Sequence, residues 1–227
     1  MQRVRVKICG LREPKQALRV AQMGADAIGL VFAESPRWVS PEQARAITDV
    51  LPPLVAAVGV FVDADADLIG KVAARAGLTM AQLAGDEPPE IVSDLPIPAI
   101  KGFRIRGPDW ADEVHAWLDG VRAHRNLAAV LLDAFDPAGR GGTGRSFNWD
   151  WVRDARHAGR MAGMPPLILS GGLDASNVEA AIDVVRPWAV DVSSGVESER
   201  GVKDLRKVED FIRATREGGE LKSVFWL

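Results

Sequence analysis

The chain has 227 residues, 47% of them hydrophobic and 26% charged, a composition typical of a globular protein that buries a substantial core. The length favours one α/β domain over residues 1–227, and a formal net charge of -3 without a basic stripe argues against nucleic acid as the main partner. No apolar run approaches the roughly 18 to 20 residues of a membrane span and no signal peptide precedes the first charged residues, so we expect a cytoplasmic protein without a membrane partner.

Short β-branched or apolar runs alternate along the chain with segments of helical periodicity. The predicted strands are Val4–Cys9, Ala27–Phe32, Leu54–Val62, Thr79–Leu83, Ala99–Ile105, Ala129–Asp133, Leu167–Ser170 and Val190–Ser193. The predicted helices are 14–24, 41–51, 67–77, 88–95, 109–124, 175–185 and 203–216, of which 88–95 has the weakest pattern. Eight strand–helix units in a chain of this length predict a closed (β/α)8 barrel, a TIM barrel, since an open doubly wound sheet usually has five or six strands.

Active sites of such barrels lie at the carboxyl ends of the strands, and this criterion selects among the polar residues. It removes the three histidines, His115, His124 and His157, which fall within or just after predicted helices. The cysteine, histidines and carboxylates also show no spacing typical of a metal site. We therefore do not expect a metal site.

Cys9 and Asp133 end the first and sixth predicted strands. Strand alternation turns Lys7 and Cys9 toward the barrel axis, and Asp133 shares the parity of an inward leucine. Cys9 is the only cysteine, so it acts as a thiol and fits a reducing compartment. The bland alternatives are a buried small hydrophobe for Cys9 and a turn cap for Asp133. Lys7 would favour the Cys9 thiolate, but Asp191, inward on the adjoining eighth strand, is predicted to form an ion pair with Lys7 and limit that effect.

Two glycine-rich loops follow the last two strands. Gly171 and Gly172 follow the seventh strand, and Ser194 and Gly195 follow the eighth. Exposed backbone N–H groups and a short helical turn starting near Ser194 would bind a phosphate, as the corresponding loops do in this fold. The alternative is that the glycines only form tight turns.

Arg37 lies in the loop after the second strand, where its guanidinium could hold a ligand carboxylate bidentately or remain a solvated loop residue. The glycine-rich loop 134–148 is suited to closing over a ligand. Its Gly141–Gly144 segment lacks the lysine of a nucleotide-binding phosphate loop, which argues against an NTPase.

These residues stand in motifs that, taken together, resemble one family over nearly the whole chain. The motifs are VKICGL, GADAIGLVF, SPRWVSPEQA, QLAGDE, LLD, GGTGRSFNW, SGGL with NV, and VDVSSGVESERGVKD. In this order they resemble phosphoribosylanthranilate isomerases of tryptophan biosynthesis. The resemblance implies a cofactor-free Amadori rearrangement of a phosphorylated aminosugar, with Cys9 as general base, Asp133 as general acid and Arg37 holding the anthranilate carboxylate.

The chain departs from the family at three positions. It has Ala84 where histidine is usual, Arg145 where lysine is usual, and Ser170 where alanine is usual. Two other functions remain open: a related sugar-phosphate isomerase of histidine biosynthesis, disfavoured because it carries aspartate in place of Cys9, and a non-catalytic sugar-phosphate-binding module. The sequence leaves both a monomer and a homodimer open.

Overall fold

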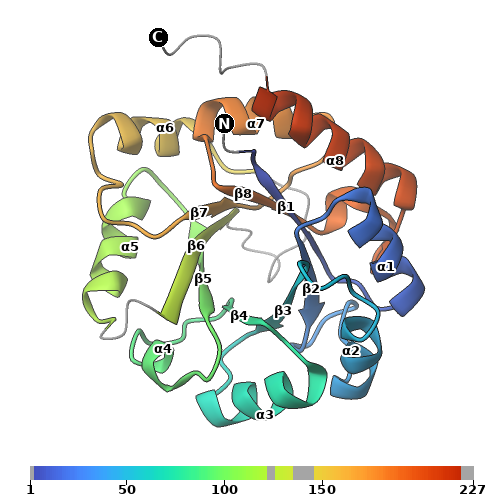
Figure 1. Cartoon of the computed structure of the whole chain (residues 1–227). Coiled ribbons are helices and arrows are strands. Elements are labelled where there is room, and N and C mark those ends of the chain that lie inside the picture. The colour runs from blue at the N-terminus through green and yellow to red at the C-terminus, as the bar shows by residue number, and fades with distance from the viewer. Residues whose placement is uncertain (1–2, 122–125, 135–145, 221–227) are drawn as a thin grey trace.

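Eight parallel strands close into a barrel in chain order, and the helices surround it (Figure 1). The computed structural model describes residues 3–121, 126–134 and 146–220, without the side chains of the last two. The strands are β1 (Arg5–Cys9), β2 (Ala27–Val31), β3 (Ala56–Phe61), β4 (Met80–Leu83), β5 (Ala99–Ile105), β6 (Leu127–Ala134), β7 (Leu167–Leu169) and β8 (Ala189–Val192). The predicted (β/α)8 barrel is therefore confirmed.

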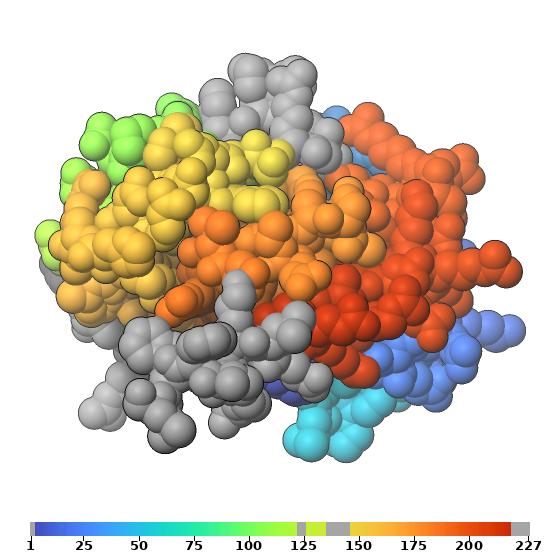
Figure 2. Space-filling model, turned by 90° about the horizontal axis from the view of Figure 1, so that it is seen from above, coloured from blue at the N-terminus to red at the C-terminus, as the bar shows by residue number. Residues whose placement is uncertain are grey.

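The outer ring has one helix for each strand. The helices are α1 (Pro14–Met23), α2 (Pro41–Thr48), α3 (Ala66–Ala76), α4 (Ile91–Asp94), α5 (Trp110–Asp119), α6 (Asp150–His157), α7 (Val178–Val185) and α8 (Leu205–Glu220). Figure 2 shows α8 between α7 and α1, so the last helix closes the ring against the first. Among the described residues, no helix is long and apolar enough to cross a membrane.

Local sequence signals explain several helix ends. Ser40 accepts a hydrogen bond from the Gln43 N–H, and the Gln43 side chain accepts one from the Ser40 N–H, a capping box that starts α2. Pro14 occupies the first turn of α1, and Gly24 ends this helix at a φ of 105°, a conformation that glycine adopts without strain. The starts of both helices and the end of α1 could thus be placed from the sequence, whereas the prediction 41–51 extends beyond the end of α2 at Thr48.

The predicted and observed helices and strands differ mainly in segments with few buried apolar residues. The predicted third strand extends too far toward the N-terminus, since Leu54 is 95% exposed before β3. Helix α6 had no prediction of its own because it buries only Val152 and Ala155. A hairpin of β9 (Glu197–Glu199) and β10 (Val202–Lys203) between β8 and α8 was also missed. The end of the predicted helix 109–124, most of the loop 134–148, His124 and Arg145 lie outside the described residues.

The two faces of the barrel strands contribute to different cores. Outward residues such as Ile8 and Leu132 pack with the helices in the large hydrophobic core. Inward residues such as Ile100, Leu131 and Ile168 fill the barrel itself. Above them, Cys9, Val31 and Val60 form a separate apolar cluster toward the carboxyl ends. Apolar side chains thus fill the interior of the barrel, and Cys9 lies near the opening at the carboxyl ends of the strands.

Gly29 on β2 keeps the space that Cys9 needs. The two residues pair across β1 and β2, and a Cβ at Gly29 would lie 2.7 Å from the Cys9 Sγ and 2.9 Å from its Cα. We expect Gly29→Ala to lower the free energy of unfolding by about 1 to 3 kcal/mol through overpacking. Urea unfolding measures this loss.

The matched control is Gly107→Ala, because a Cβ at Gly107 would meet no atom within 4 Å. This change should alter the free energy of unfolding by less than about 0.5 kcal/mol. Equal stabilities of the two variants would show that the contact at Gly29 does not constrain Cys9.

Candidate active site

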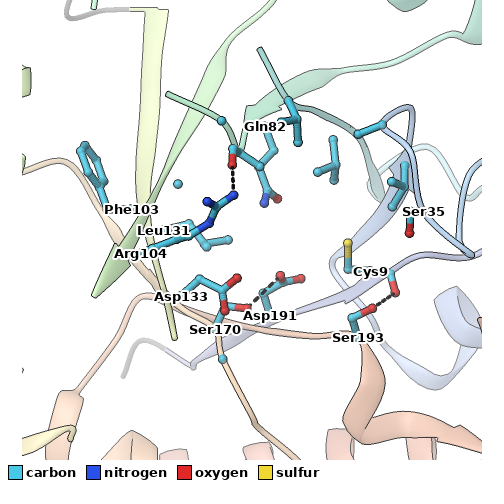
Figure 3. Close-up of a pocket in the computed structure, with 18 of the residues that line it drawn as sticks. Cys9, Ser35, Gln82, Phe103, Arg104, Leu131, Asp133, Ser170, Asp191 and Ser193 are labelled. Atoms are coloured by element: carbon cyan, nitrogen blue, oxygen red, sulfur yellow. Dashed lines mark hydrogen bonds between the residues drawn. The ribbon is translucent and has the colours of Figure 1, made fainter. Parts of the chain in front are cut away.

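The carboxyl ends of the eight strands surround a cavity of about 1560 Å³. Cys9, Asp133 and Asp191 all line it, and Figure 3 shows Asp191 between the other two in projection. The structure thus brings the predicted thiol and carboxyl into one cavity. They share it with the two predicted phosphate loops.

Cys9 is buried at the end of β1, directly above an ion pair. Lys7 Nζ donates to Asp191 Oδ1 at 2.7 Å, and both side chains are buried. The predicted Lys7–Asp191 pair is therefore confirmed. Burial raises the pKa of the Cys9 thiol; Lys7 acts in the opposite direction and Asp191 adds to the increase. The thiolate is consequently a minor form at neutral pH.

Ser170 adds a second contact to this pair. Its hydroxyl donates to Asp191 Oδ2 at 3.3 Å (Figure 3), so Asp191 accepts from both Lys7 and Ser170. The serine at this position thus lines the cavity and supports Asp191 there.

Asp133 is the last residue but one of β6 and lines the cavity. Its Oδ1 accepts a hydrogen bond from the Ala134 N–H at 2.9 Å. Burial and the nearby negative charge of Asp191 raise the pKa of Asp133 from 3.8 to about 6, while that hydrogen bond, Arg104 and Lys7 lower it. A carboxyl group with this pKa still holds a proton in part of the molecules at neutral pH, which suits a general acid.

Arg37 is neither solvated nor free, which corrects the solvated-loop alternative. It is only 7% exposed, and its Nε and Nη2 donate to the two carboxylate oxygens of Glu197 at 2.7 and 2.8 Å. Its Nη1 donates to no described residue. Arg37 nevertheless lines the cavity, so a ligand carboxylate could meet the remaining N–H groups.

The two glycine loops present backbone N–H groups to the cavity. Gly171 and Gly172 adopt φ values of 90° and 64°, and a Cβ at Gly195 would collide with the Leu173 carbonyl. Within the described part of the chain, the N–H groups of Gly171, Gly172, Ser194 and Gly195 donate to no protein acceptor. The predicted helical turn is present as the 3-10 turn η2 (Ser194–Val196). These loops can therefore bind an anion.

The wall formed by β2, β3 and β4 is apolar. Val31, Ala33, Val60 and Ala84 pack around Cys9. The Ala84 side chain is part of this wall, and its carbonyl accepts a hydrogen bond from Arg104 Nη2 at 3.1 Å (Figure 3). The small residue at position 84 thus extends this apolar surface beside the thiol, which suits an aromatic ring.

Several polar residues around the cavity had not been identified from the sequence. Gln82 and Arg104 face inward by the same strand parity that selected Cys9, and this signal could have found them. Glu197 and Lys203 belong to the β9–β10 hairpin, for which strand periodicity gave no indication. Their contribution depends on how the hairpin folds back on the barrel.

The described residues contain no group of three or more histidine, cysteine, aspartate or glutamate side chains able to hold a metal ion. His115 is on α5, where its Nε2 contacts the Arg160 carbonyl at 2.8 Å, and His157 is on α6. Both histidines thus belong to the outer ring of helices.

An inward-facing thiol and carboxyl beside two loops whose N–H groups donate to no described residue are the arrangement expected of a (β/α)8-barrel enzyme that acts on a small phosphorylated ligand. A family model described as N-(5'phosphoribosyl)anthranilate (PRA) isomerase matches residues 6–214. The chain belongs to this family.

Individual relatives agree with this assignment. An N-(5'-phosphoribosyl)anthranilate isomerase of Geobacter metallireducens is 44% identical over 94% of this chain and 99% of its own length. The crystal structure of phosphoribosyl anthranilate isomerase from Thermotoga maritima is 40% identical, covers 94% of this chain and 99% of its own, and superposes with a TM-score of 0.83. A phosphoribosyl anthranilate isomerase in complex with reduced 1-(o-carboxyphenylamino)-1-deoxyribulose 5-phosphate is 38% identical over 94% of this chain and 99% of its own, with a TM-score of 0.79.

The raised pKa of Asp133 predicts a stability effect with a definite sign. Since this pKa is about 6 in the folded chain against an ordinary 3.8, the stability that the group contributes is complete below pH 3.8 and is lost as the pH rises through about 6. We expect Asp133→Asn to raise the free energy of unfolding at about pH 8 by on the order of 2 to 3 kcal/mol, and to give no gain at about pH 4. Urea unfolding at both pH values measures it, and an equal gain at both would contradict the assignment.

Proposed function

We propose that this chain opens the ribose ring of N-(5-phosphoribosyl)anthranilate and isomerises it to 1-(2-carboxyphenylamino)-1-deoxy-D-ribulose 5-phosphate, a step of L-tryptophan biosynthesis. This is the activity for which its family is named. The observation that carries the proposal is the placement of a thiol and a carboxyl of raised pKa in one cavity. The related structure with a reduced form of the product supports the same ligand class.

The cavity offers a separate surface for each part of this substrate. The phosphate would bind the N–H groups of Gly171, Gly172, Ser194 and Gly195, which lack protein acceptors among the described residues. The aromatic ring would lie on the apolar wall beside Ala84. Its carboxylate would then be within the reach of Arg37, whose Nη1 is not used by Glu197. The ribose lies between these ends, over Cys9 and Asp133.

The rearrangement needs one proton delivered and one removed. Asp133 donates a proton to the ring oxygen, the bond between this oxygen and C1 breaks, and the nitrogen lone pair forms a C1=N iminium. Cys9 thiolate then takes the proton from C2, the electrons of that C–H bond form C1=C2, and the C1=N π electrons return to nitrogen to give the enaminol. Protonation at C1 and loss of the proton of the C2 hydroxyl give the ketone and restore both groups to their starting protonation states, so the product is an isomer of the substrate. General acid–base catalysis by two placed groups is sufficient for these steps.

The two pKa directions define the pH profile. The reaction uses Asp133 with its proton, although its pKa is about 6, and Cys9 without its proton, although burial raises the pKa of this thiol above its ordinary value. Between the two pKa values, each increase of one pH unit lowers the fraction of protonated Asp133 and raises the fraction of Cys9 thiolate by the same factor. The product of the two fractions, and with it kcat/KM, therefore stays constant. Below about pH 6 the carboxyl is already protonated while the thiolate keeps decreasing, and kcat/KM falls.

Asp133→Asn tests both the activity and this order of protonation. We expect kcat to fall by about two to four orders of magnitude, the usual contribution of a general acid. The residual kcat/KM should keep rising about tenfold per unit from about pH 5 to about pH 8, because only the thiolate fraction then matters. The assay follows the loss of phosphoribosylanthranilate fluorescence, and Cys9→Ser should also lose most turnover.

No turnover by the unmodified chain would contradict the proposed function and favour a binding module. Near-normal turnover by Asp133→Asn or by Cys9→Ser would remove the corresponding residue from the mechanism. A profile of Asp133→Asn that is level above about pH 6, like that of the unmodified chain, would contradict the order of protonation.

Arg37→Ala tests the carboxylate site. A lost charged hydrogen bond should weaken binding of the product by on the order of 1.5 to 3 kcal/mol, whereas binding of inorganic phosphate should not change. Glu197 keeps Lys203 as an ion-pair partner in this variant, which limits the structural damage. Calorimetric titration measures both ligands, and an unchanged product affinity would show that Arg37 acts only within the protein.

A further inference from the structure

Glu197, the first residue of β9, joins two cations in the segment that follows β8. Arg37 donates two hydrogen bonds to it, Lys203 Nζ donates to its Oε1 at 2.7 Å, and the Gly201 N–H donates to its Oε2 at 3.2 Å. The three side chains, here called the Glu197 cluster, are buried, and that of Lys203 is 0% exposed. Arg37 comes from the loop after β2 and the other two from the β9–β10 hairpin.

The Glu197 cluster has a net positive charge, because it contains two cations and one carboxylate. Two cations face one carboxylate, and their hydrogen bonds lower the pKa of Glu197 to about 2 in spite of its burial. Lys203 has three acceptors, namely Glu197 Oε1, the Ser193 carbonyl at 2.9 Å and the Ser193 hydroxyl at 3.3 Å. These match the three donors of an ammonium group and favour the charged form of Lys203, whereas burial lowers the pKa of Lys203 from its ordinary 10.5.

Ser193 connects Lys203 to Cys9. The Ser193 hydroxyl donates to the Cys9 carbonyl at 3.1 Å (Figure 3), so one residue separates the ammonium group from the thiol-bearing residue. Cys9 thus lies at the end of a short polar path that begins at the Glu197 cluster.

The other described charges around Cys9 are largely matched by opposite ones. Lys7 on β1 is paired with Asp191 on β8. Asp133 on β6 is opposed by Arg104, its register partner on β5. Arg37, in the loop after β2, belongs to the Glu197 cluster itself. The unmatched positive charge near the thiol therefore comes from this cluster.

We propose that Lys203 is a positioning residue for Cys9: it holds Ser193 against the Cys9 carbonyl and supplies the positive charge that sustains the thiolate. The claim that Lys203 assists catalysis rests on the proposed function, in which Cys9 is the base. The claim that its charge stabilises the Cys9 thiolate does not depend on that function. In agreement with it, Lys203 lowers the pKa of Cys9, while burial and Asp191 raise it.

The test uses the fact that Cys9 is the only cysteine of the chain. The rate of alkylation by iodoacetamide is measured over a range of pH, because only the thiolate reacts and the midpoint of the profile is the pKa of Cys9. The full chain is used, and circular dichroism confirms that each variant is folded.

Removing the charge should raise this midpoint. We expect Lys203→Gln and Lys203→Met to shift it upward by about one pH unit, with about a tenfold slower alkylation at neutral pH. Lys203→Arg keeps the charge and should leave the midpoint nearly unchanged. The matched control is Lys207→Met, since Lys207 Nζ donates to the Glu197 backbone carbonyl at 2.7 Å but not to its carboxylate or to Ser193.

An unchanged midpoint in Lys203→Gln would overturn the inference, and so would an equal shift in Lys203→Arg, because the charge would then not be the cause. If Lys203→Met does not fold, Lys203→Gln carries the same test with a hydrogen-bond donor retained. The expected shifts together with full turnover by Cys9→Ser would instead reject Cys9 as the catalytic base and leave the electrostatic role of Lys203 standing.

Discussion

The barrel closes where β1 pairs with β8, and a buried ion pair between Lys7 and Asp191 lies on this seam. Removing one partner from such a pair leaves an uncompensated buried charge, a loss on the order of 3 to 5 kcal/mol. The pair also lies directly beneath the residues of the site. The Lys7–Asp191 pair, which joins β1 to β8, therefore also contributes to the pKa values of Cys9 and Asp133.

Burial and charge act against each other throughout the cavity. Burial raises the pKa of both Cys9 and Asp133, and Asp191 adds to the effect on each. Lys7 opposes both shifts but is shared with Asp191. As a result, Asp133 keeps its proton in part of the molecules at neutral pH, and Cys9 is rarely ionised. If Cys9 is the base, its thiolate therefore needs positive charge in addition to that of Lys7.

In our proposal, the β9–β10 hairpin provides that charge through Lys203. The hairpin also determines which donors of Arg37 remain available to a ligand. Glu197 occupies the fork of the guanidinium that a ligand carboxylate would otherwise fill. Arg37 is thereby fixed in orientation with its remaining donor available, which lowers the entropy lost on binding a ligand. In the proposed binding mode, the apolar wall beside Ala84 would hold the aromatic part of the substrate.

Strand alternation, read from the sequence alone, placed Lys7, Cys9, Asp133 and Asp191 inside the barrel, because a period of two fixes the face of each side chain once the strand is recognised. Adjacent glycines identified the loops at 171–172 and 194–195 for the same local reason. The partner of Arg37, the link from Lys203 through Ser193 to Cys9, and the pKa of Asp133 could not be predicted in this way. They depend on segments that meet only after the barrel has closed, 160 residues apart for Arg37 and Glu197, and on a depth of burial that no local pattern records.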